Sequence, residues 1–175
     1  MEPYQQGELD GLCGIYSLIN TLRLVLGNLR KDECVEILDQ SLEFIEKKNK
    51  LSEIITGGIS VILLSQIFRA VVDNKYSINR QKPFHKKTDV PVDEYWETVR
   101  EFLNEDSNRA VLIAYDGDDF SHWSIVKAAT SKTFTLFDSN NNRRIYRRLC
   151  TTQEISELIP YKLTPYQTFF ISKKE

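Results

Sequence analysis

The hydrophobic pattern of this chain changes its period near Asn108, and this change constrains the fold more than any other feature. Before it, apolar residues recur every three to four positions, which predicts helices over residues 13–26, 32–50, 61–72 and 91–103, the second ending in the polar, basic EKKNK of residues 46–50. After it, the pattern predicts strands over residues 110–115, 123–128, 133–137, 143–149 and 168–171. Helices gathered first and an antiparallel sheet second are typical of an α+β domain, and we expect one domain over residues 1–175.

Short signals place the boundaries between these elements. Asp32 and Ser60 are candidate N-caps for the second and third helices. Residues 56–58 (Thr-Gly-Gly) predict a turn. The basic stretch over residues 79–89 is expected to be a surface loop, so His85 within it is interpreted as a solvated side chain.

Charge and apolar run length exclude two classes of partner. Lys and Arg total 23 against 25 for Asp and Glu, a net charge of −2, whereas a nucleic-acid partner calls for a basic surplus. The longest apolar run, residues 61–64, is far below the roughly 20 residues that cross a bilayer, so no membrane partner is expected. The first residues show no secretory signal, which favours a cytoplasmic protein, with delivery elsewhere as an effector as the alternative.

The three cysteines are widely spaced, which fits neither a disulfide framework nor a metal knuckle, so no metal and no cofactor are predicted. Cys13 stands where a glycine-containing turn gives way to the first predicted helix. First-turn N–H groups and the helix dipole stabilise a thiolate, which is the nucleophilic form. Gly11 and Gly14 are expected to leave room for an incoming carbonyl. The alternative, a small buried hydrophobic side chain, is our interpretation of Cys34 and Cys150.

His122 opens a predicted strand and is the candidate base for Cys13. If the next two strands fold back around Thr130, paired residue numbers sum to 260, and His122 then faces Asp138. A carboxylate there can orient the imidazole, as the third member of a triad does. The alternative is an ordinary polar pair at a sheet end. Gln5 and Gln6 precede Cys13, and Gln6 is the nearer candidate donor to the oxyanion of a tetrahedral intermediate.

These residues resemble the papain-like cysteine peptidases. The likeness rests on YQQGELDGLCGIYSLIN, FSHWSIV, FTLFDSN and the helical stretch between the first two. The compact form is similar to domains that process bacteriocin leaders and to small bacterial papain-fold effectors. It implies a helical N-terminal part, with the cysteine at the start of its first helix, packed on a C-terminal antiparallel sheet. It also implies Cys13 as nucleophile, His122 as base, Asp138 as its orienting partner and Gln6 as oxyanion donor.

The sequence departs from that family at one point: six residues separate Gln6 from Cys13, whereas the family commonly has five, so Gln5 remains an alternative. The resemblance implies a thiol hydrolase, a peptidase or isopeptidase, that cleaves an amide bond in a protein or peptide. The alternatives are an acyl transferase, a transglutaminase-like enzyme or a deamidase with the same triad, and a catalytically silent binding module. The scissile bond and the oligomeric state stay open.

Two charged segments give weaker signals. The acidic turn over residues 116–119 lacks calcium-ligand spacing and is interpreted as solvated, although its place beside His122 predicts a preference for basic substrate segments. The arginines of residues 143–148 alternate along a predicted strand, so we expect a solvated edge strand rather than a phosphate-binding stripe.

Overall fold

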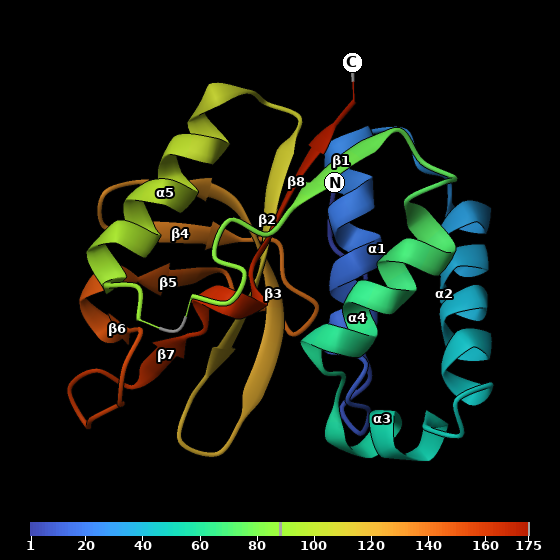
Figure 1. Cartoon of the computed structure of the whole chain (residues 1–175), viewed down its shortest axis with the longest axis horizontal. Coiled ribbons are helices and arrows are strands. Elements are labelled where there is room, and N and C mark those ends of the chain that lie inside the picture. Colours follow the sequence, from blue (N-terminus) through green and yellow to red (C-terminus); the bar gives the residue numbers. More distant parts are fainter. Residues whose placement is uncertain (88, 175) are drawn as a thin grey trace.

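The computed structural model describes residues 1–87 and 89–174, and within them five α-helices and a predominantly antiparallel sheet form an α+β fold (Figure 1). The helices are α1 (Cys13–Leu26), α2 (Lys31–Glu46), α3 (Leu51–Gly57), α4 (Val61–Ile67) and α5 (Val92–Glu105). The strands are β1 (Ile78–Gln81), β2 (Arg109–Asp116), β3 (Ser121–Ala129), β4 (Thr133–Leu136), β5 (Arg144–Tyr146), β6 (Cys150–Thr151), β7 (Tyr161–Leu163) and β8 (Phe169–Lys173). The predicted fold class, α+β with an antiparallel sheet, is therefore confirmed at this level.

The sheet lies between two layers of helix (Figure 1). Its main path runs β1-β8-β2-β3-β4-β5, and β7 joins it by pairing with β2. The pairing of β6 with β7 is parallel, and the other strand pairs among the described residues are antiparallel. Helices α1, α2 and α4 cover one face and α5 covers the other, so the central strands are buried on both sides.

Strand β2 shows how one segment serves both cores. Leu112 and Ala114 belong to the cluster that the sheet shares with α1, α2 and α4, whereas Val111 and Ile113 belong to the cluster shared with α5. Successive side chains of a strand point to opposite faces, so an unbroken apolar run fills both clusters. This explains why residues 110–115 carry no alternation of apolar and polar residues.

Most helix predictions are confirmed, with small shifts at the ends. Helix α1 has the predicted bounds, and the Ser60 side chain caps α4 by accepting a hydrogen bond from Leu63 N. Helix α2 begins at Lys31 with Arg30 as its N-cap residue, so the prediction of Asp32 is wrong by two positions. The helix predicted over residues 61–72 ends as a π-helical turn over Phe68–Val72.

The remaining differences concern short elements. Residues 51–57 form α3, where only a turn was predicted, and the predicted loop over residues 79–89 begins with most of strand β1; Thr88 and Glu175 lie outside the described residues. The predicted fifth strand shortens to β5 and a 3-10 turn, and β5 is the last strand of the main path. Arg147 in that turn forms ion pairs with Asp93 and Glu97 of α5. None of the helices in the described ranges is long and apolar enough to span a bilayer.

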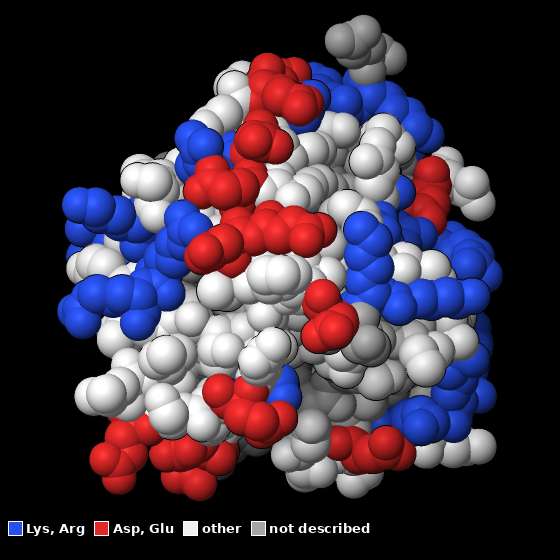
Figure 2. Space-filling model, turned by 60° about the vertical axis from the view of Figure 1, so that its left-hand side comes forward, with Lys and Arg blue, Asp and Glu red and all other residues white. Residues whose placement is uncertain are grey.

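Charge of both signs covers the side of the molecule that carries α5. Figure 2 shows Asp and Glu in an irregular band across this face, with Lys and Arg gathered on either side of it. Helix α5 supplies carboxylates along its length: Asp93, Glu94, Glu97, Glu101 and Glu105. Arg147, in the turn after β5, pairs with two of these carboxylates, and this face shows no single basic stripe.

Candidate active site

Cys13 is the first residue of α1, and the residue is buried, at 6% exposed. One hydrogen bond ties α1 to the sheet, and a second ties the same strand to the segment that precedes α4. The hydroxyl of Ser17, one turn further along, donates to the Trp123 carbonyl of β3 at 2.9 Å. The indole Nε1 of Trp123 donates in turn to the Ile59 carbonyl at 2.9 Å. The position of Cys13 relative to β3 is therefore set by buried contacts.

The glycines on either side of Cys13 have packing roles. A Cβ atom added to Gly14 would collide with the Ile59 side chain and lie 3.2 Å from the Trp123 ring. A Cβ atom added to Gly11 would lie 2.7 Å from the backbone nitrogen of Gly58. Both positions need glycine because neighbouring elements approach closely. The sequence argument assigned these residues to substrate access, whereas the structure shows close contacts of Gly14 with Ile59 and with Trp123 of β3, and of Gly11 with the end of α3.

His122 and Asp138 lie together behind Cys13. His122 is the second residue of β3, and its Nε2 atom lies 2.8 Å from Asp138 Oδ2. Both residues are buried, at 6% and 2% exposed. The structure thus brings the predicted pair into contact, although not by the predicted register.

The strand register differs from the prediction by two residues. Val126 pairs with Leu136 rather than with Phe134, and the paired numbers sum to 262 instead of 260. A bulge between Val126 and Ala128 and a longer hairpin loop cause the shift. On the hairpin side of the bulge the paired numbers sum to 263, but from Val126 toward His122 the shift is two residues, which keeps these side chains on their predicted face, whereas a shift by one would reverse them. His122 and Asp138 therefore still meet, on the same side of the sheet and within reach of each other.

The carboxylate of Asp138 accepts hydrogen bonds on both oxygens. While Oδ2 contacts His122, Oδ1 accepts from the backbone N–H groups of Asn140 at 2.7 Å and Asn142 at 3.1 Å. Burial raises the pKa of Asp138, but the hydrogen bond and charge of His122 and the hydrogen bond from the Asn140 N–H lower it by more, so the net shift is downward. Asp138 is thus held as a carboxylate with its geometry fixed by the loop that follows it.

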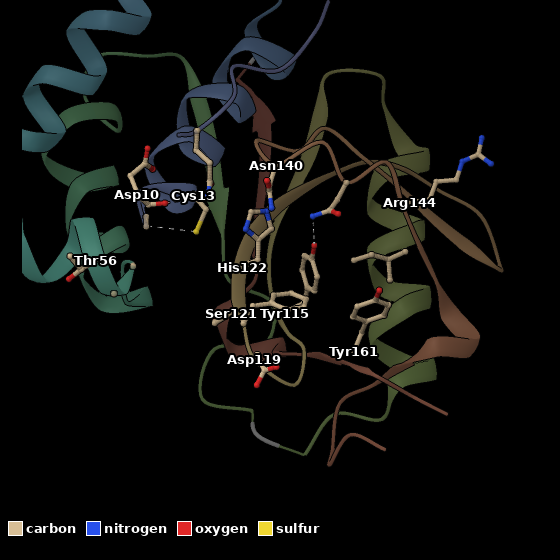
Figure 3. Close-up of a pocket in the computed structure, with 17 residues that line it drawn as sticks. Asp10, Cys13, Thr56, Tyr115, Asp119, Ser121, His122, Asn140, Arg144 and Tyr161 are labelled. Carbon is tan, nitrogen blue, oxygen red and sulfur yellow. Dashed lines mark hydrogen bonds between the residues drawn. The ribbon is translucent and has the colours of Figure 1, made fainter. Parts of the chain in front are cut away.

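The imidazole of His122 stands between Asp138 and Cys13. Figure 3 shows Cys13 beside His122 at the cavity, and the hydrogen bond drawn from its sulfur runs to the Gly11 carbonyl at 3.9 Å. Since Nε2 is engaged by Asp138, Nδ1 is the ring nitrogen left for the thiol. Burial lowers the pKa of His122, but the hydrogen bonds to Asp138 and Cys13 and their charges outweigh it and raise the pKa to about 9. The site therefore favours the imidazolium form of His122 beside the Asp138 carboxylate.

Gln6 lies in the same cleft as Cys13, and Gln5 is turned elsewhere. The Gln6 N–H donates to the Ser139 carbonyl at 3.0 Å, and the Ser139 hydroxyl donates to Gln6 Oε1 at 3.1 Å. That second bond identifies the oxygen of the amide and leaves its NH₂ group on the other side, 3.4 Å from the Asp10 carbonyl. The Gln5 amide donates instead to the Asp138 carbonyl at 3.2 Å. Of the two candidates, Gln6 is the one that the structure places among the cleft residues.

Cys13, His122 and Gln6 line one cavity of about 600 Å³. An aromatic wall lies beside His122: the Tyr115 ring packs edge-on against the imidazole, with ring centroids 5.6 Å apart, and contacts Phe120 and Tyr161 in the same way. The Tyr115 hydroxyl accepts a hydrogen bond from the Asn142 amide at 3.1 Å. Burial and the charge of Asp138 raise the pKa of Tyr115, so this hydroxyl stays protonated.

Opposite charges line the two ends of the cavity. Asp10 and Asp119 lie on the side of Cys13 and His122, and the long side chain of Arg144 extends away from them (Figure 3). Asp119 belongs to the predicted acidic turn, where the Gly117 N–H donates to the Phe120 carbonyl. The part of the cavity nearest the sulfur is therefore lined by carboxylates.

Several residues of the site escaped the sequence argument. Ser139 and Asn142 bind Gln6, Asp138 and Tyr115, and the only sequence signal for them is the polar run that follows Asp138. Tyr115 lay within a predicted strand and was counted as apolar core.

The other titratable candidates lie elsewhere. Cys34 is buried in α2, Cys150 is buried in β6, and His85 is exposed. Within residues 1–87 and 89–174, His, Cys, Asp and Glu do not gather into a group of three or more that could hold a metal ion.

Cys13, His122 and Asp138 therefore form the cluster in which a thiol, an imidazole and a carboxylate follow one another beside an open cavity. Comparisons of this chain with protein-family models, with curated proteins and with solved structures give no match.

Proposed function

We propose that this chain is a cysteine-dependent hydrolase that cleaves an amide bond in a protein or peptide through an acyl-enzyme. The observation that carries the proposal is the order of groups at the cleft. Asp138 holds Nε2 of a buried His122 at 2.8 Å, and Cys13, at the start of α1, lines the same cavity and interacts with the same imidazole. A thiol, a base and an orienting carboxylate in this order are the machinery of nucleophilic catalysis.

A papain-like fold is part of the proposal. In support, the cysteine begins the first helix, the histidine begins a strand, the aspartate follows the next strand, and the helix packs on that sheet. The aromatic wall and the acidic end of the cavity leave room for a peptide beside the sulfur. A compact peptidase or isopeptidase combines these features most simply.

The first half-reaction forms the acyl-enzyme. The Cys13 proton resides on His122 Nδ1, and the thiolate attacks the carbonyl carbon of the substrate, forming a C–S bond while the carbonyl π electrons move to oxygen. The Gln6 NH₂ group and the Cys13 backbone N–H stabilise that oxyanion. When the intermediate collapses, the C–N bond breaks and the imidazolium gives its proton to the leaving amine.

The second half-reaction decides the type of enzyme. In a hydrolase, His122 takes a proton from water, the hydroxide attacks the thioester carbon, and the thiolate leaves as the carboxylic acid forms. A transferase uses an amine instead of water, and a deamidase attacks a side-chain amide and releases ammonia. These alternatives share the first half-reaction, so product analysis distinguishes them.

Acylation by p-nitrophenyl acetate tests the proposal without knowledge of the natural substrate. The expected result is a stoichiometric burst of nitrophenolate and one acetyl group on Cys13 in intact-mass spectra. The Cys13→Ala variant is expected to lose the burst, whereas Cys34→Ala retains it. Addition of an excess of a primary amine then shows whether water or the amine resolves the acyl-enzyme.

Wild type that releases nitrophenolate no faster than Cys13→Ala contradicts the proposal and favours a silent binding module. Acetylation of another residue contradicts the assignment of Cys13. Capture of the acyl group by the amine in preference to water moves the assignment from hydrolase to acyl transferase.

A further inference from the structure

Residues 2–7, the N-terminal segment, have no regular secondary structure but are fixed by side chains of α1. The Tyr4 N–H donates to Asn20 Oδ1 at 2.8 Å, and Asn20 Nδ2 donates to the Tyr4 carbonyl at 2.9 Å. Arg23 supports this clamp: it donates to Asn20 Oδ1 at 3.2 Å and to the Glu2 carbonyl at 2.8 Å, and its guanidinium lies 4.0 Å above the Tyr4 ring.

Among the described residues, the Asn20 side chain forms hydrogen bonds with Tyr4 and Arg23 and with no residue of the sheet. It is fully buried in an amphipathic helix, where an amide has a cost unless its groups are hydrogen-bonded. Through its two bonds to Tyr4, the Asn20 amide offers the Tyr4 backbone one donor and one acceptor, as the backbone of a paired strand would. The amide is therefore suited to hold a passing backbone in one register.

Asn20 and Cys13 also lie on the same side of α1, because seven residues are close to two helical turns. At roughly 1.5 Å per residue, the two positions are about 10 Å apart along the helix axis. An extended segment advances about 3.3 Å per residue, so two residues beyond Tyr4 cover about two thirds of that distance. Gln6 is that second residue, and its side chain covers the remaining length toward Cys13.

The clamp also selects between the two glutamines. Neighbouring side chains of an extended segment point to opposite sides. With Tyr4 held at Asn20, the Gln5 amide reaches the Asp138 carbonyl and the Gln6 amide reaches Ser139 in the cleft. A slip of one residue at the clamp would exchange these two positions.

We infer that Asn20 is a positioning residue of the active site: by clamping Tyr4 it sets the register of the N-terminal segment and thereby places the Gln6 amide beside Cys13. One helix then positions both the nucleophile and the oxyanion donor. The inference rests on the proposed function, because an oxyanion donor matters only if Cys13 attacks a carbonyl.

Two reagents separate this role from a merely structural one. Acylation by p-nitrophenyl acetate develops an oxyanion, whereas alkylation of the thiol by iodoacetamide does not. The test variant is Asn20→Asp, whose new carboxylate remains beside Arg23 but cannot donate to the Tyr4 carbonyl. Thr21→Val is the matched control, since it removes a buried hydrogen bond of α1 that ends on Ser17.

Asn20→Asp is expected to slow the nitrophenolate burst by roughly 10²-fold, the size of losing one oxyanion donor. Its alkylation rate is expected to stay within about 3-fold of wild type, and Thr21→Val to change neither rate by more than that. In a Gln6→Ala background, Asn20→Asp is expected to slow the burst no further, because the donor that it positions is already gone.

A nitrophenolate burst in Asn20→Asp as fast as in Thr21→Val overturns the inference. A burst that Asn20→Asp slows as much in the Gln6→Ala background as in wild type overturns it as well. If Asn20→Asp fails to fold by circular dichroism, Tyr4→Pro removes the N–H from the other side of the clamp, and the same criteria apply. If wild type shows no burst above Cys13→Ala, the proposed function itself fails and the positioning role falls with it.

Discussion

Cys13 and Cys150 are buried to a similar degree, at 6% and 4% exposed, and each donates to a backbone carbonyl, but their other neighbours differ. Cys13 begins a helix and faces an imidazole, whereas Cys150 begins a short strand and donates a hydrogen bond to the Tyr146 carbonyl at 3.3 Å. Burial raises the pKa of Cys150 to about 12, so that thiol stays protonated. At similar exposure, the two thiols therefore differ in their neighbours, since only Cys13 lies beside His122.

By cavity size alone, Cys150 would be the better candidate for an active-site thiol. The cavity beside Cys150 has a volume of about 770 Å³, larger than the 600 Å³ of the cleft at Cys13. Among the described residues that line it, the charged groups are Asp93, Lys132, Arg147 and Arg148, and an imidazole is not among them. Arg147 is engaged with Asp93. A large hollow beside a thiol is thus a weaker sign of catalysis than a small one that holds a base with a fixed orientation.

The comparison predicts its largest effect in thiol reactivity. At pH 7 we expect iodoacetamide to alkylate Cys13 at least about 10³-fold faster than Cys150, because a thiol with a pKa near 12 exposes roughly 10⁻⁵ of its population as thiolate. Peptide mapping after timed labelling measures both rates in one sample. His122→Gln is expected to slow only Cys13. Equal rates for the two thiols would remove the distinction.

The second-largest expected effect concerns Asp138, the carboxylate that contacts His122. Asp138→Asn is expected to reduce the rate of acylation by roughly 10²–10⁴-fold, because the amide no longer stabilises the imidazolium and no longer fixes the tautomer. The matched control is Asp93→Asn, at the cavity of Cys150, which breaks an ion pair with Arg147 and leaves acylation unchanged. An Asp138→Asn variant that acylates at the wild-type rate would show that the His122–Asp138 contact is only structural.

The raised pKa of His122 predicts how stability depends on pH. The folded protein holds the imidazolium up to about pH 9, whereas the unfolded chain releases it near 6.5. The stabilisation is therefore complete below pH 6.5 and is lost as pH rises toward 9, on the order of 3 kcal/mol in all. Urea unfolding of wild type and His122→Gln at pH 6 and pH 9.5 measures this difference.

His85→Gln is the control for that experiment, since His85 is exposed. It is expected to follow wild type at both pH values. A wild-type protein whose advantage over His122→Gln is the same at pH 6 and pH 9.5 would mean that the imidazolium is not favoured in the fold, and the ion pair between His122 and Asp138 would lose its basis.

The sequence predicted those features of the site that depend on periodicity. The helix start at Cys13 and the common face of His122 and Asp138 follow from periods of 3.6 and 2 residues, and both agree with the structure. The hairpin register could not be predicted, because the bulge at Lys127 is set by tertiary packing. A two-residue error was harmless only because it preserved the alternation.

Residues whose role arises from long-range contacts were missed. Nothing near Asn20 in the sequence shows that Tyr4 lies against it, and Ser139 looks like any polar residue after a strand. Strand β1 was missed for the same reason: it is short, polar and basic, and it forms only by pairing with β8 near the other end of the chain. Local pattern identifies amphipathic elements well and edge strands poorly.

The smallest expected effect concerns the negative charge at the cleft of Cys13. Asp119 lines the cleft at Cys13, while its neighbour Asp118 is exposed and does not line that cleft. We expect Asp119→Asn to lower kcat/KM about 2–3-fold for peptides with a lysine beside the scissile bond and to leave neutral peptides unchanged, since one exposed charge is worth under about 1 kcal/mol. Asp118→Asn is expected to have less effect, and 0.5 M salt to erase the difference because it screens exposed charges. Equal losses for lysine-containing and neutral peptides would mean that Asp119 supports the β2–β3 turn rather than selecting basic substrates.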